Sequence, residues 1–298
     1  MLERFINWLL GGLRTHELAR RLDLTIDELK SIDLTYQKFE IKKKSGKPRY
    51  ISAPNAELKS LQRRILRRLL KALNTHPQAT GFQPGVSFVD NARCHQSQAI
   101  VIRIDLVDFF PSILQKGVYG FFRRLGWDQT TSKLLANLTT HDGRLPQGAP
   151  TSPRLSNLMC VGLDFRMANL AEEHGAVYTR YADDITMSLG EGYHDVHELV
   201  GRMVMHIRQQ GFQPHLKEKF DVRRQHQRQI VTGLVVNDQA NLPREKRRWL
   251  RAVEHRMRLQ EKGAYLGPNP SLTEEQLQGW QSLRKMINRD RVSKGTPF

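Results

Sequence analysis

The sequence predicts an α+β fold in which an antiparallel sheet is covered by helices. Two runs of alternating apolar residues, at 177–181 and 185–189, flank "ADD" and indicate a hairpin of half-buried strands. The short apolar run "AIVIRI" at 99–104 indicates another strand. Helical spacing of apolar residues elsewhere, clearest at 56–73, supplies the covering helices.

The first part of the chain is expected to alternate helices with one hairpin. "FINWLLGGL" at 5–13 is typical of an amphipathic helix. Residues 15–30 indicate two short helices, the second capped by Thr25 with Glu28 three residues on. "YQKFEIKKKSGKPRYISAP" at 36–54 predicts two strands joined by a basic turn. The stripe of the helix that follows consists of Leu58, Leu61, Ile65, Leu69 and Leu73.

The rest of the chain is predicted to be mainly helical around the aspartate hairpin. Two helical segments cover roughly 113–139, a loop "DGRLPQGAPTSP" follows, and a long helix precedes the hairpin. A further helix covers about 194–210, and "RQIVTGLVVN" ends in a strand. Residues 243–298 are predominantly helical. A composition shift near Asn237 divides the chain into predicted domains 1–237 and 238–298.

The charge balance indicates a polyanionic partner. In 298 residues, 47 Lys and Arg face 30 Asp and Glu, a formal net charge of +17. Residues 243–262 alone carry eight basic side chains against three acids, which favours nucleic acid over a merely soluble basic protein. Only two cysteines occur, which excludes a disulfide framework and a Cys-rich zinc site and fits a reducing, cytoplasmic location. No apolar run is long enough to span a bilayer, so no membrane partner is expected.

Two acidic groups are candidates for metal chemistry. Asp183 and Asp184 place like charges in a turn that would ordinarily favour Asn-Gly or Asp-Gly. Asp105 stands at the end of the strand at 99–104. If the three carboxylates share one site, each raises the pKa of the others, and two Mg²⁺ ions would offset the repulsion and serve phosphoryl transfer. The alternatives are a solvated turn for the pair and a helix cap for Asp105.

Several motifs carry a family resemblance. "YADD" at 181–184 resembles the Tyr-x-Asp-Asp box of reverse transcriptases, and "DLVDFF" at 105–110 resembles their first palm aspartate motif. "LPQGAPTSPRLSNL" at 145–158 is similar to their Pro-Gln-Gly motif, and "PRYISAPNAELKSLQRRIL" at 48–66 to the fingers motif of the bacterial branch. The blocks occur in the family's order and cover roughly residues 45–240.

Two shorter signatures narrow the resemblance to retron reverse transcriptases. "NARCH" at 91–95 resembles their Asn-Ala-x-x-His signature, and "VTG" at 231–233 their Val-Thr-Gly signature. The short length of the chain agrees with this expectation, since it would leave no room for maturase and endonuclease extensions. The rival hypotheses are a group II intron-like or diversity-generating reverse transcriptase and, from another class, a noncatalytic RNA-binding scaffold with a polymerase fold.

The resemblance implies a right-hand polymerase fold and a specific reaction. Residues 1–237 would form N-terminal helices with interleaved fingers and palm, and 238–298 a helical, basic, RNA-binding thumb. The enzyme would be an RNA-directed DNA polymerase that uses dNTPs and Mg²⁺. A cognate structured noncoding RNA would serve as template and primer, with synthesis from an RNA 2′-OH and a branched RNA–DNA product that stays bound. A separate effector protein and a role in anti-phage defence are also implied.

The resemblance also assigns roles to residues. Asp105, Asp183 and Asp184 would be the catalytic metal ligands, with backbone groups of Leu106 and Val107 nearest the metal-bound triphosphate. The implied nucleotide-binding residues are Lys47, Arg49, Asp108, Phe109, Phe110, Gln147 and Gly148. The implied RNA-binding residues are Asn91, His95, Val231, Thr232, Gly233, Arg244, Arg247, Arg248 and Arg251.

Some of these roles have alternatives that the sequence leaves open. Phe110 would be the steric gate against a ribose 2′-OH, whereas Phe109 is equally compatible with core packing. Trp249 can stack on a base, although packing against the core suits its helical position better. The sequence departs from the family after "GFQP", so the proton donor to pyrophosphate stays unassigned among His215, Lys217 and Lys219.

Overall fold

A computed structural model describes residues 12–42, 46, 48–192, 195–217, 220–261 and 274–289. The helix expected over 5–13 falls largely outside these residues. Lys47 and Lys219 also lie outside them. In the described ranges, no helix is both long and apolar enough to cross a membrane.

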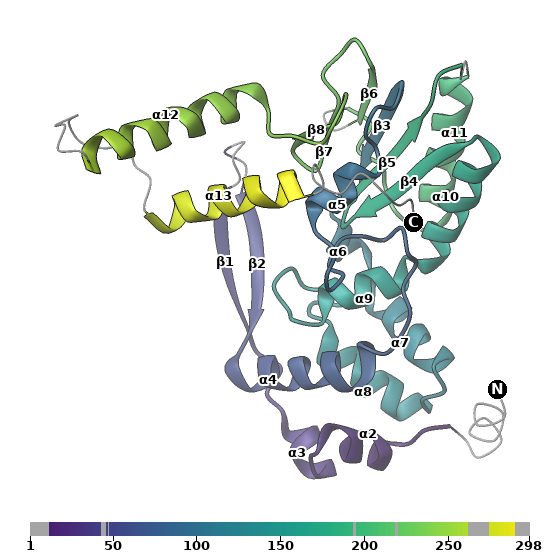
Figure 1. Cartoon of the computed structure of the whole chain (residues 1–298). Coiled ribbons are helices and arrows are strands. Elements are labelled where there is room, and N and C mark those ends of the chain that lie inside the picture. The colour runs from purple at the N-terminus through teal and green to yellow at the C-terminus, as the bar shows by residue number, and fades with distance from the viewer. Residues whose placement is uncertain are drawn as a thin grey trace.

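The central element is a four-stranded sheet in the order β4-β5-β3-β6 (Figure 1). Its strands are β3 (Ile100–Asp105), β4 (Ala176–Tyr181), β5 (Asp184–Leu189) and β6 (Phe220–Arg224). Every neighbouring pair is antiparallel, which together with the surrounding helices confirms the predicted α+β class. Strand β6 was not expected from the sequence.

The two faces of the sheet have different coverings. Helices α10 (Val161–Glu173) and α11 (Val196–Gln209) pack on one face, against Ile100, Ile102 and Ile104 of the main hydrophobic core. The alternation of β3 turns Val101 to the other face, where it joins a second core with helix α5 (Phe88–Arg93). The sheet is therefore buried on both sides, and its polar positions need internal partners.

The N-terminal part is built from helices α2, α3 and α4 around the hairpin of β1 and β2. Thr25 caps α3 through the predicted capping box with Glu28. Strands β1 and β2 pair antiparallel from Tyr36 opposite Pro54 to Lys42 opposite Pro48, as the sequence predicted. The elements are α2 (Thr15–Leu22), α3 (Ile26–Ser31), β1 (Tyr36–Lys42), β2 (Pro48–Pro54) and α4 (Ala56–Ile65).

A π-helical turn, η1 (Leu66–Leu70), interrupts the apolar stripe that follows α4. The Lys71 N–H donates to the Leu66 carbonyl over 2.9 Å, an i→i−5 bond that adds one residue to the turn. The stripe is therefore displaced by one position after Ile65: Leu70 is fully buried, whereas Leu69 is only half-buried.

The remaining helices carry the connecting segments. They are α6 (Phe109–Ser112), α7 (Gln115–Arg124), α8 (Gln129–Thr139), α9 (Ser152–Met159), α12 (Arg244–Glu261) and α13 (Glu274–Asn288). The long helix expected before the aspartate hairpin is divided at Cys160 into α9 and α10. The expected strand near 230–237 is instead a small hairpin of β7 (Ile230–Val231) and β8 (Leu234–Val235).

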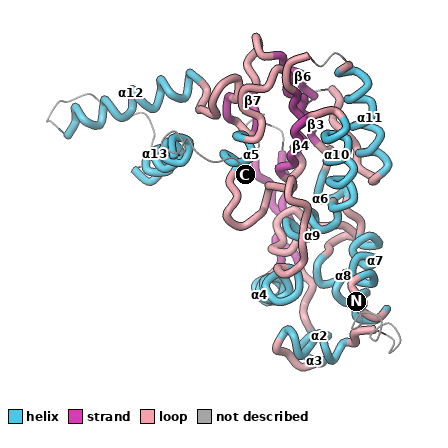
Figure 2. The backbone as a smooth tube through the Cα atoms, turned by 45° about the vertical axis from the view of Figure 1, so that its right-hand side comes forward, coloured by secondary structure: helices cyan, strands magenta, loops and turns pink. Residues whose placement is uncertain are grey.

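Helices α12 and α13 extend from the sheet as an arm, away from α7 and α8 (Figures 1 and 2). The second core attaches this arm, because Leu250, Val253 and Leu277 pack with Val231 and Leu234. Arg93 of α5 also donates to the Met286 carbonyl of α13 over 2.9 Å. The position near Asn237 thus lies within one continuous core, and a domain boundary there stays a prediction.

Candidate active site

The strand register brings the predicted aspartates to one end of the sheet. Asp105, the last residue of β3, lies directly opposite Asp184, the first residue of β5. Residues paired in this way project from the same face of the sheet. Asp183 occupies the turn before β5, and its carbonyl accepts from the Leu106 N–H over 2.9 Å. Two chain segments that are far apart in the sequence therefore meet at this edge of the sheet.

The turn that carries Asp183 is strained. Ala182 has a φ of 59°, in the left-handed region that a non-glycine side chain disfavours. Such a residue costs on the order of 1–3 kcal/mol and persists only where its surroundings hold it. A buried hydrogen-bond network holds Ala182 in this conformation.

Arg180 is the centre of that network. Its guanidinium donates to the Ala182 carbonyl over 3.0 Å and to the Asn157 side chain over 3.1 Å. Two further N–H groups reach both oxygens of Asp164, each at 2.7 Å. The side chains of Arg180 and Asp164 are 0% exposed, and the Tyr178 hydroxyl also donates to Asp164 at 2.8 Å. A bidentate pair of this kind fixes the guanidinium, and so fixes the donor to the strained turn.

A close backbone approach completes the support. Gly81 lies so near the turn that a Cβ on it would stand 2.5 Å from the Ala182 nitrogen. Asn157 donates to the Gly81 carbonyl over 2.7 Å, and the Thr80 N–H donates to the Arg180 carbonyl over 2.9 Å. The absence of a side chain at Gly81 thus permits this backbone to lie against the aspartate turn.

The sequence analysis missed this network, although one signal was present. Arg180 follows the buried residues Tyr178 and Thr179 on strand β4, and Asp164 interrupts the apolar face of helix α10. Two opposite charges at buried positions are rarely unpaired. Their pairing could have been proposed, but not the contact with Ala182.

The segment at 213–215 borders the site on a second side. The Val107 N–H donates to the Gln213 carbonyl, and the His215 N–H to the Asp105 carbonyl, each over 2.8 Å. Of the described proton-donor candidates, His215 therefore lies beside Asp105, and Lys217 is exposed two residues further on.

The Pro-Gln-Gly loop lies against the β1–β2 hairpin. Ser52 of β2 donates its N–H to the Gln147 carbonyl over 2.8 Å. Gly148 has a φ of 132°, and a Cβ there would stand 2.7 Å from the Ser52 carbonyl oxygen. The expected close approach at Gly148 is thus to β2. Arg49, on the same strand, is exposed.

Asn91 and His95, which the resemblance assigns to RNA binding, have buried side chains with internal partners. Asn91 is 1% exposed and accepts from the Thr80 hydroxyl over 2.6 Å. His95 is 0% exposed, and its ring nitrogens lie 2.7 Å from the Ser188 hydroxyl and 2.8 Å from that of Thr179. His95 therefore links β4 to β5, and burial lowers its pKa to about 3, which keeps it neutral.

Three further side chains are buried rather than presented to a ligand. Phe109 is 4% exposed and packs against Phe110 and Phe212, so the core-packing alternative holds for it. Val231 belongs to the second core, and the Leu106 side chain to the main core, which leaves only their backbone groups for contacts. Phe110, by contrast, is half-buried.

Other predicted residues remain accessible. Asp108 is exposed, with a φ of 45° at the start of α6. Thr232 and Gly233 form the turn of the β7–β8 hairpin with φ values of 45° and 86°, and the Thr232 hydroxyl donates to the Phe88 carbonyl over 2.7 Å. Positive φ at both central residues matches a type I′ turn.

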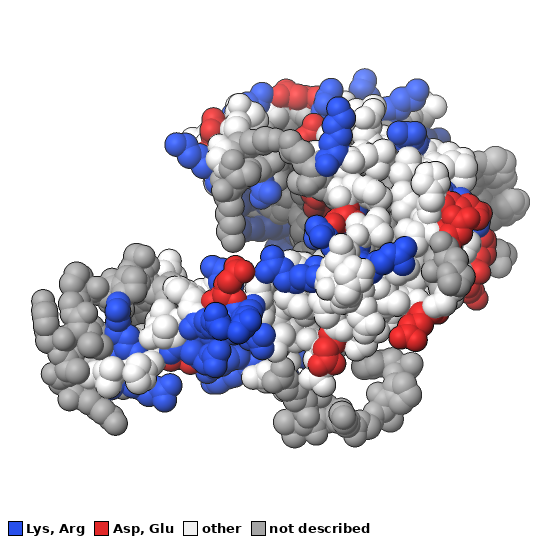
Figure 3. Space-filling view, turned by 90° about the horizontal axis from the view of Figure 1, so that it is seen from above, with Lys and Arg blue, Asp and Glu red and all other residues white. Residues whose placement is uncertain are grey.

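The basic residues of α12 share one exposed side. Arg244, Arg247, Arg248 and Arg251 follow helical spacing and are all exposed. Seen from above, Lys and Arg gather on the arm formed by this helix (Figure 3). Trp249 faces the other way: its ring lies 5.6 Å from that of Trp280, edge to face, with the Lys246 ammonium within 6 Å of both rings. Packing, rather than an exposed stacking surface, accounts for Trp249 here.

The carboxylates of Asp105, Asp183 and Asp184 are of the chemical type that binds divalent cations. Their oxygen donors, on adjacent strands and in the turn between strands, are the ligands that Mg²⁺ prefers. In the part of the chain that the structure describes, however, no three acidic, His or Cys side chains are gathered closely enough to hold an ion. Asp184 is instead turned toward Arg103 of β3, which donates to it over 2.9 Å. Arg103 is a second residue of the site that sequence analysis missed.

Comparison with known proteins places the residues of this site within a known family. The model of the family "Reverse transcriptase (RNA-dependent DNA polymerase)" matches residues 41–231, a range that takes in both aspartate segments. Residues 41–231 accordingly form a reverse transcriptase domain.

Individual relatives define the family further. The chain is 32% identical to the Retron Ec86 reverse transcriptase of Escherichia coli, over 90% of this chain and 82% of that protein. It is 34% identical to the Retron Mx162 reverse transcriptase of Myxococcus xanthus, over 94% of this chain, and 38% identical to the Retron Mx65 reverse transcriptase of the same organism, over 74%. The chain belongs to the retron-type bacterial reverse transcriptases. It spans 64% and 55% of the length of the two Myxococcus relatives.

Proposed function

We propose that the chain is an RNA-directed DNA polymerase that copies a cognate structured RNA into single-stranded DNA. The observation that carries the proposal is the register of β3 and β5, which sets Asp105 opposite Asp184 beside the turn of Asp183. Family membership supports the reaction class, since the relatives are named as retron reverse transcriptases.

In this proposal the described elements take the parts of a right-hand polymerase. The four-stranded sheet with α9, α10 and α11 is the palm, and the β1–β2 hairpin with the N-terminal helices belongs to the fingers. The thumb begins near residue 238 and contains α12 and α13. The extension of α12 and α13 from the sheet as an arm supports this division (Figure 1).

The proposed catalytic residues are Asp105, Asp183 and Asp184. With the Leu106 carbonyl they would hold two Mg²⁺ ions, which when bound stabilise the charge on the phosphate oxygens. The Arg180 network would fix the positions of Asp183 and Asp184 relative to Asp105, because Arg180 donates a hydrogen bond to the Ala182 carbonyl of the same turn.

The nucleotide is proposed to lie between this edge and the β1–β2 hairpin. Gln147 and Gly148 lie against β2, so Gln147 and the exposed Arg49 can face one ligand from two sides. Phe110 is proposed as the gate that excludes a ribose 2′-OH, and Asp108 as a neighbour of the triphosphate. Lys47 keeps its proposed role as a phosphate contact.

The RNA is proposed to contact the exposed arginines of α12 and the Thr232–Gly233 turn, through phosphates and shape. The same RNA would supply a 2′-OH primer and remain attached to the DNA as a branched product. A separate effector protein and a defence role belong to the same hypothesis.

The test is template-directed incorporation by matched charge variants. Asp183→Asn should abolish dTTP incorporation on poly(rA) primed with oligo(dT) in Mg²⁺, while the affinity for RNA stays near that of the parent. Asp27→Asn, which removes one exposed charge far along the chain on α3, is the control and should incorporate normally. Incorporation by Asp183→Asn at the parent rate would remove Asp183 from the mechanism, and no incorporation by the parent would favour a noncatalytic scaffold.

The retron type is tested by the chemistry of priming. With the structured RNA transcribed from DNA beside the coding sequence, the product should contain a 2′–5′ branch that a debranching nuclease releases. Extension from 3′ ends alone would favour a group II intron-like or diversity-generating enzyme.

A further inference from the structure

A pocket lies between helices α7 and α8. These two helices lie at the opposite end of the molecule from the α12 arm (Figures 1 and 2). The volume of the pocket is about 500 Å³, within the range of small-ligand sites. Residues at helical spacing on both helices line it: Gln115, Lys116, Tyr119, Gln129, Thr130, Lys133, Ala136 and Asn137.

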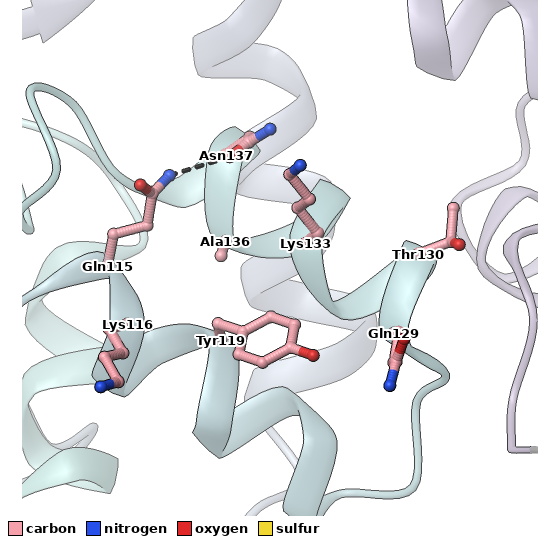
Figure 4. Close-up of a pocket in the computed structure, with 8 residues that line it drawn as sticks. All are labelled: Gln115, Lys116, Tyr119, Gln129, Thr130, Lys133, Ala136 and Asn137. Atoms are coloured by element: carbon pink, nitrogen blue, oxygen red, sulfur yellow. Dashed lines mark hydrogen bonds between the residues drawn. The ribbon is translucent and has the colours of Figure 1, made fainter.

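Tyr119 forms an aromatic side of the pocket, and the small side chain of Ala136 lies near it (Figure 4). The Tyr119 ring is half-buried, since one side packs on the main core. Ala136 is 1% exposed and contributes only a methyl group, which leaves room above it. An aromatic face beside such a space suits a flat ring, because stacking on an aromatic side chain is the usual way that proteins hold an unpaired base.

Amide groups stand at one end of this space. Gln115 donates to the Asn137 side-chain oxygen over 2.8 Å. This bond orients both amides and leaves an oxygen on Gln115 and N–H groups on Asn137 for other partners. Amides with one free acceptor and free donors match the edges of nucleobases.

The charge of the lining is wholly positive. Lys116 and Lys133 are exposed, one on each helix, and no acidic residue lines the pocket. The lining residues are mostly polar in type, with Tyr119 and Ala136 as the exceptions. Two cations beside an aromatic face and amides fit phosphates on either side of a base.

We propose that the α7–α8 pocket binds a nucleotide of single-stranded RNA, with the base on Tyr119 and flanking phosphates on Lys116 and Lys133. The inference rests on the proposed function, because it assigns a second contact to the RNA that such a polymerase copies. It is separate from the α12 arginines, which lie on another part of the molecule, so a bound RNA extends over both surfaces.

The first test measures the affinity for a fluorescein-labelled r(U)12 oligonucleotide by anisotropy, over a series of salt concentrations. Each phosphate neutralised on a single strand contributes about −0.7 to the slope of log K against log salt. The double variant Lys116→Gln/Lys133→Gln should therefore have a slope less negative by about 1.4. The matched control is Lys30→Gln/Arg208→Gln, which removes the same charge from exposed positions on α3 and α11.

The second test locates the contact. Tyr119→Leu keeps an apolar side chain against the core but removes the stacking face, and should weaken binding roughly 5- to 150-fold. An oligonucleotide carrying 5-iodouridine should crosslink under ultraviolet light to the peptide that contains Tyr119. The lysine variants change exposed side chains only, so they keep the test decisive if Tyr119→Leu folds poorly.

Three outcomes would overturn the proposal. They are a salt slope for the lysine variant equal to that of the control, crosslinks that exclude residues 115–137, and equal affinity of a well-folded Tyr119→Leu. Each would leave the pocket to a different ligand, such as a protein partner. Incorporation by the parent chain is measured in parallel, because its absence would refute the proposed function without bearing on where r(U)12 binds.

Discussion

Replacing Asp164 with Asn removes one charge of the buried pair with Arg180 and keeps the side-chain shape. Both partners are fully buried, so the lost charge leaves the guanidinium without a counter-ion in a region that excludes water. Breaking such a pair costs about 3–5 kcal/mol. At about 2 °C per kcal/mol for a chain of this size, Tm should fall by roughly 6–10 °C.

Two further variants separate stability from positioning. Arg180→Met/Asp164→Leu replaces both charges with apolar side chains, which is often neutral for folding, so it should recover much of the lost stability. It still leaves the Ala182 carbonyl without its donor. Because small displacements of reacting groups cost on the order of 10²-fold in rate, incorporation should stay about that far below the parent. Asp221→Asn, at a half-exposed pair with Arg223, is the control and should change Tm little.

The assays are thermal unfolding of the RNA-free chain and single-turnover dTTP incorporation on primed poly(rA). A double variant that regains both stability and the parent rate would show that Arg180 stabilises the fold without positioning the aspartate turn. An Asp164→Asn chain with the parent Tm would refute the energetic argument itself.

Three other predictions concern the same region. Burial lowers the pKa of His95 to about 3. Between pH 6.5 and 3, therefore, only the unfolded chain takes up a proton at this residue. The free energy of unfolding should fall by about 1.4 kcal/mol for each pH unit from 6.5 toward 3. Urea unfolding of His95→Gln should lack this part of the pH slope, and equal slopes would show that folded His95 is protonated. Gly148→Ala should reduce incorporation and Tm, because the new Cβ would clash with the Ser52 carbonyl oxygen. The control is Gly143→Ala, which also has a positive φ but has open space around it. Equal losses in the two variants would show that the clash is not the cause. Phe110→Ala should admit ribonucleotides in competition with dNTPs, and unchanged selectivity would place the gate elsewhere.

Local patterns predicted the central part of the fold. The alternation around "ADD" located β4 and β5, and the apolar run ending at Asp105 located β3. Each of these strands has six residues, which is long enough for a strand pattern to be recognised. The capping box at Thr25 was also a local signal.

The remaining features depend on distant partners. Strand β6 has a half-exposed, basic sequence and exists because β3 has a free edge to pair with. Strands β7 and β8 have two residues each, too few for any period to appear. The π turn at 66–70 has one visible contributor, Arg154 of α9, which donates to the carbonyls of Leu70, Lys71 and Leu73 at its C-terminal end.

Sequence analysis predicted the acidic residues of the site but not the residues that hold them in position. Asp105 and Asp184 could be paired from the strand pattern, since both stand at strand ends. The roles of Arg180 and Arg103 could not, because each follows from which side chain the fold places next to it. The burial of Asn91 and His95 was hidden for the same reason: a signature shared by a family does not say whether it faces ligand or core.

The contact between Arg103 and Asp184 bears on how the chain reaches its folded form. Two carboxylates placed directly opposite one another on neighbouring strands repel, which opposes closure of the sheet at that end. A guanidinium built into the same strand as Asp105 supplies the compensating charge from within the polypeptide. The positive charge that offsets this repulsion is thus carried by the neighbouring strand itself.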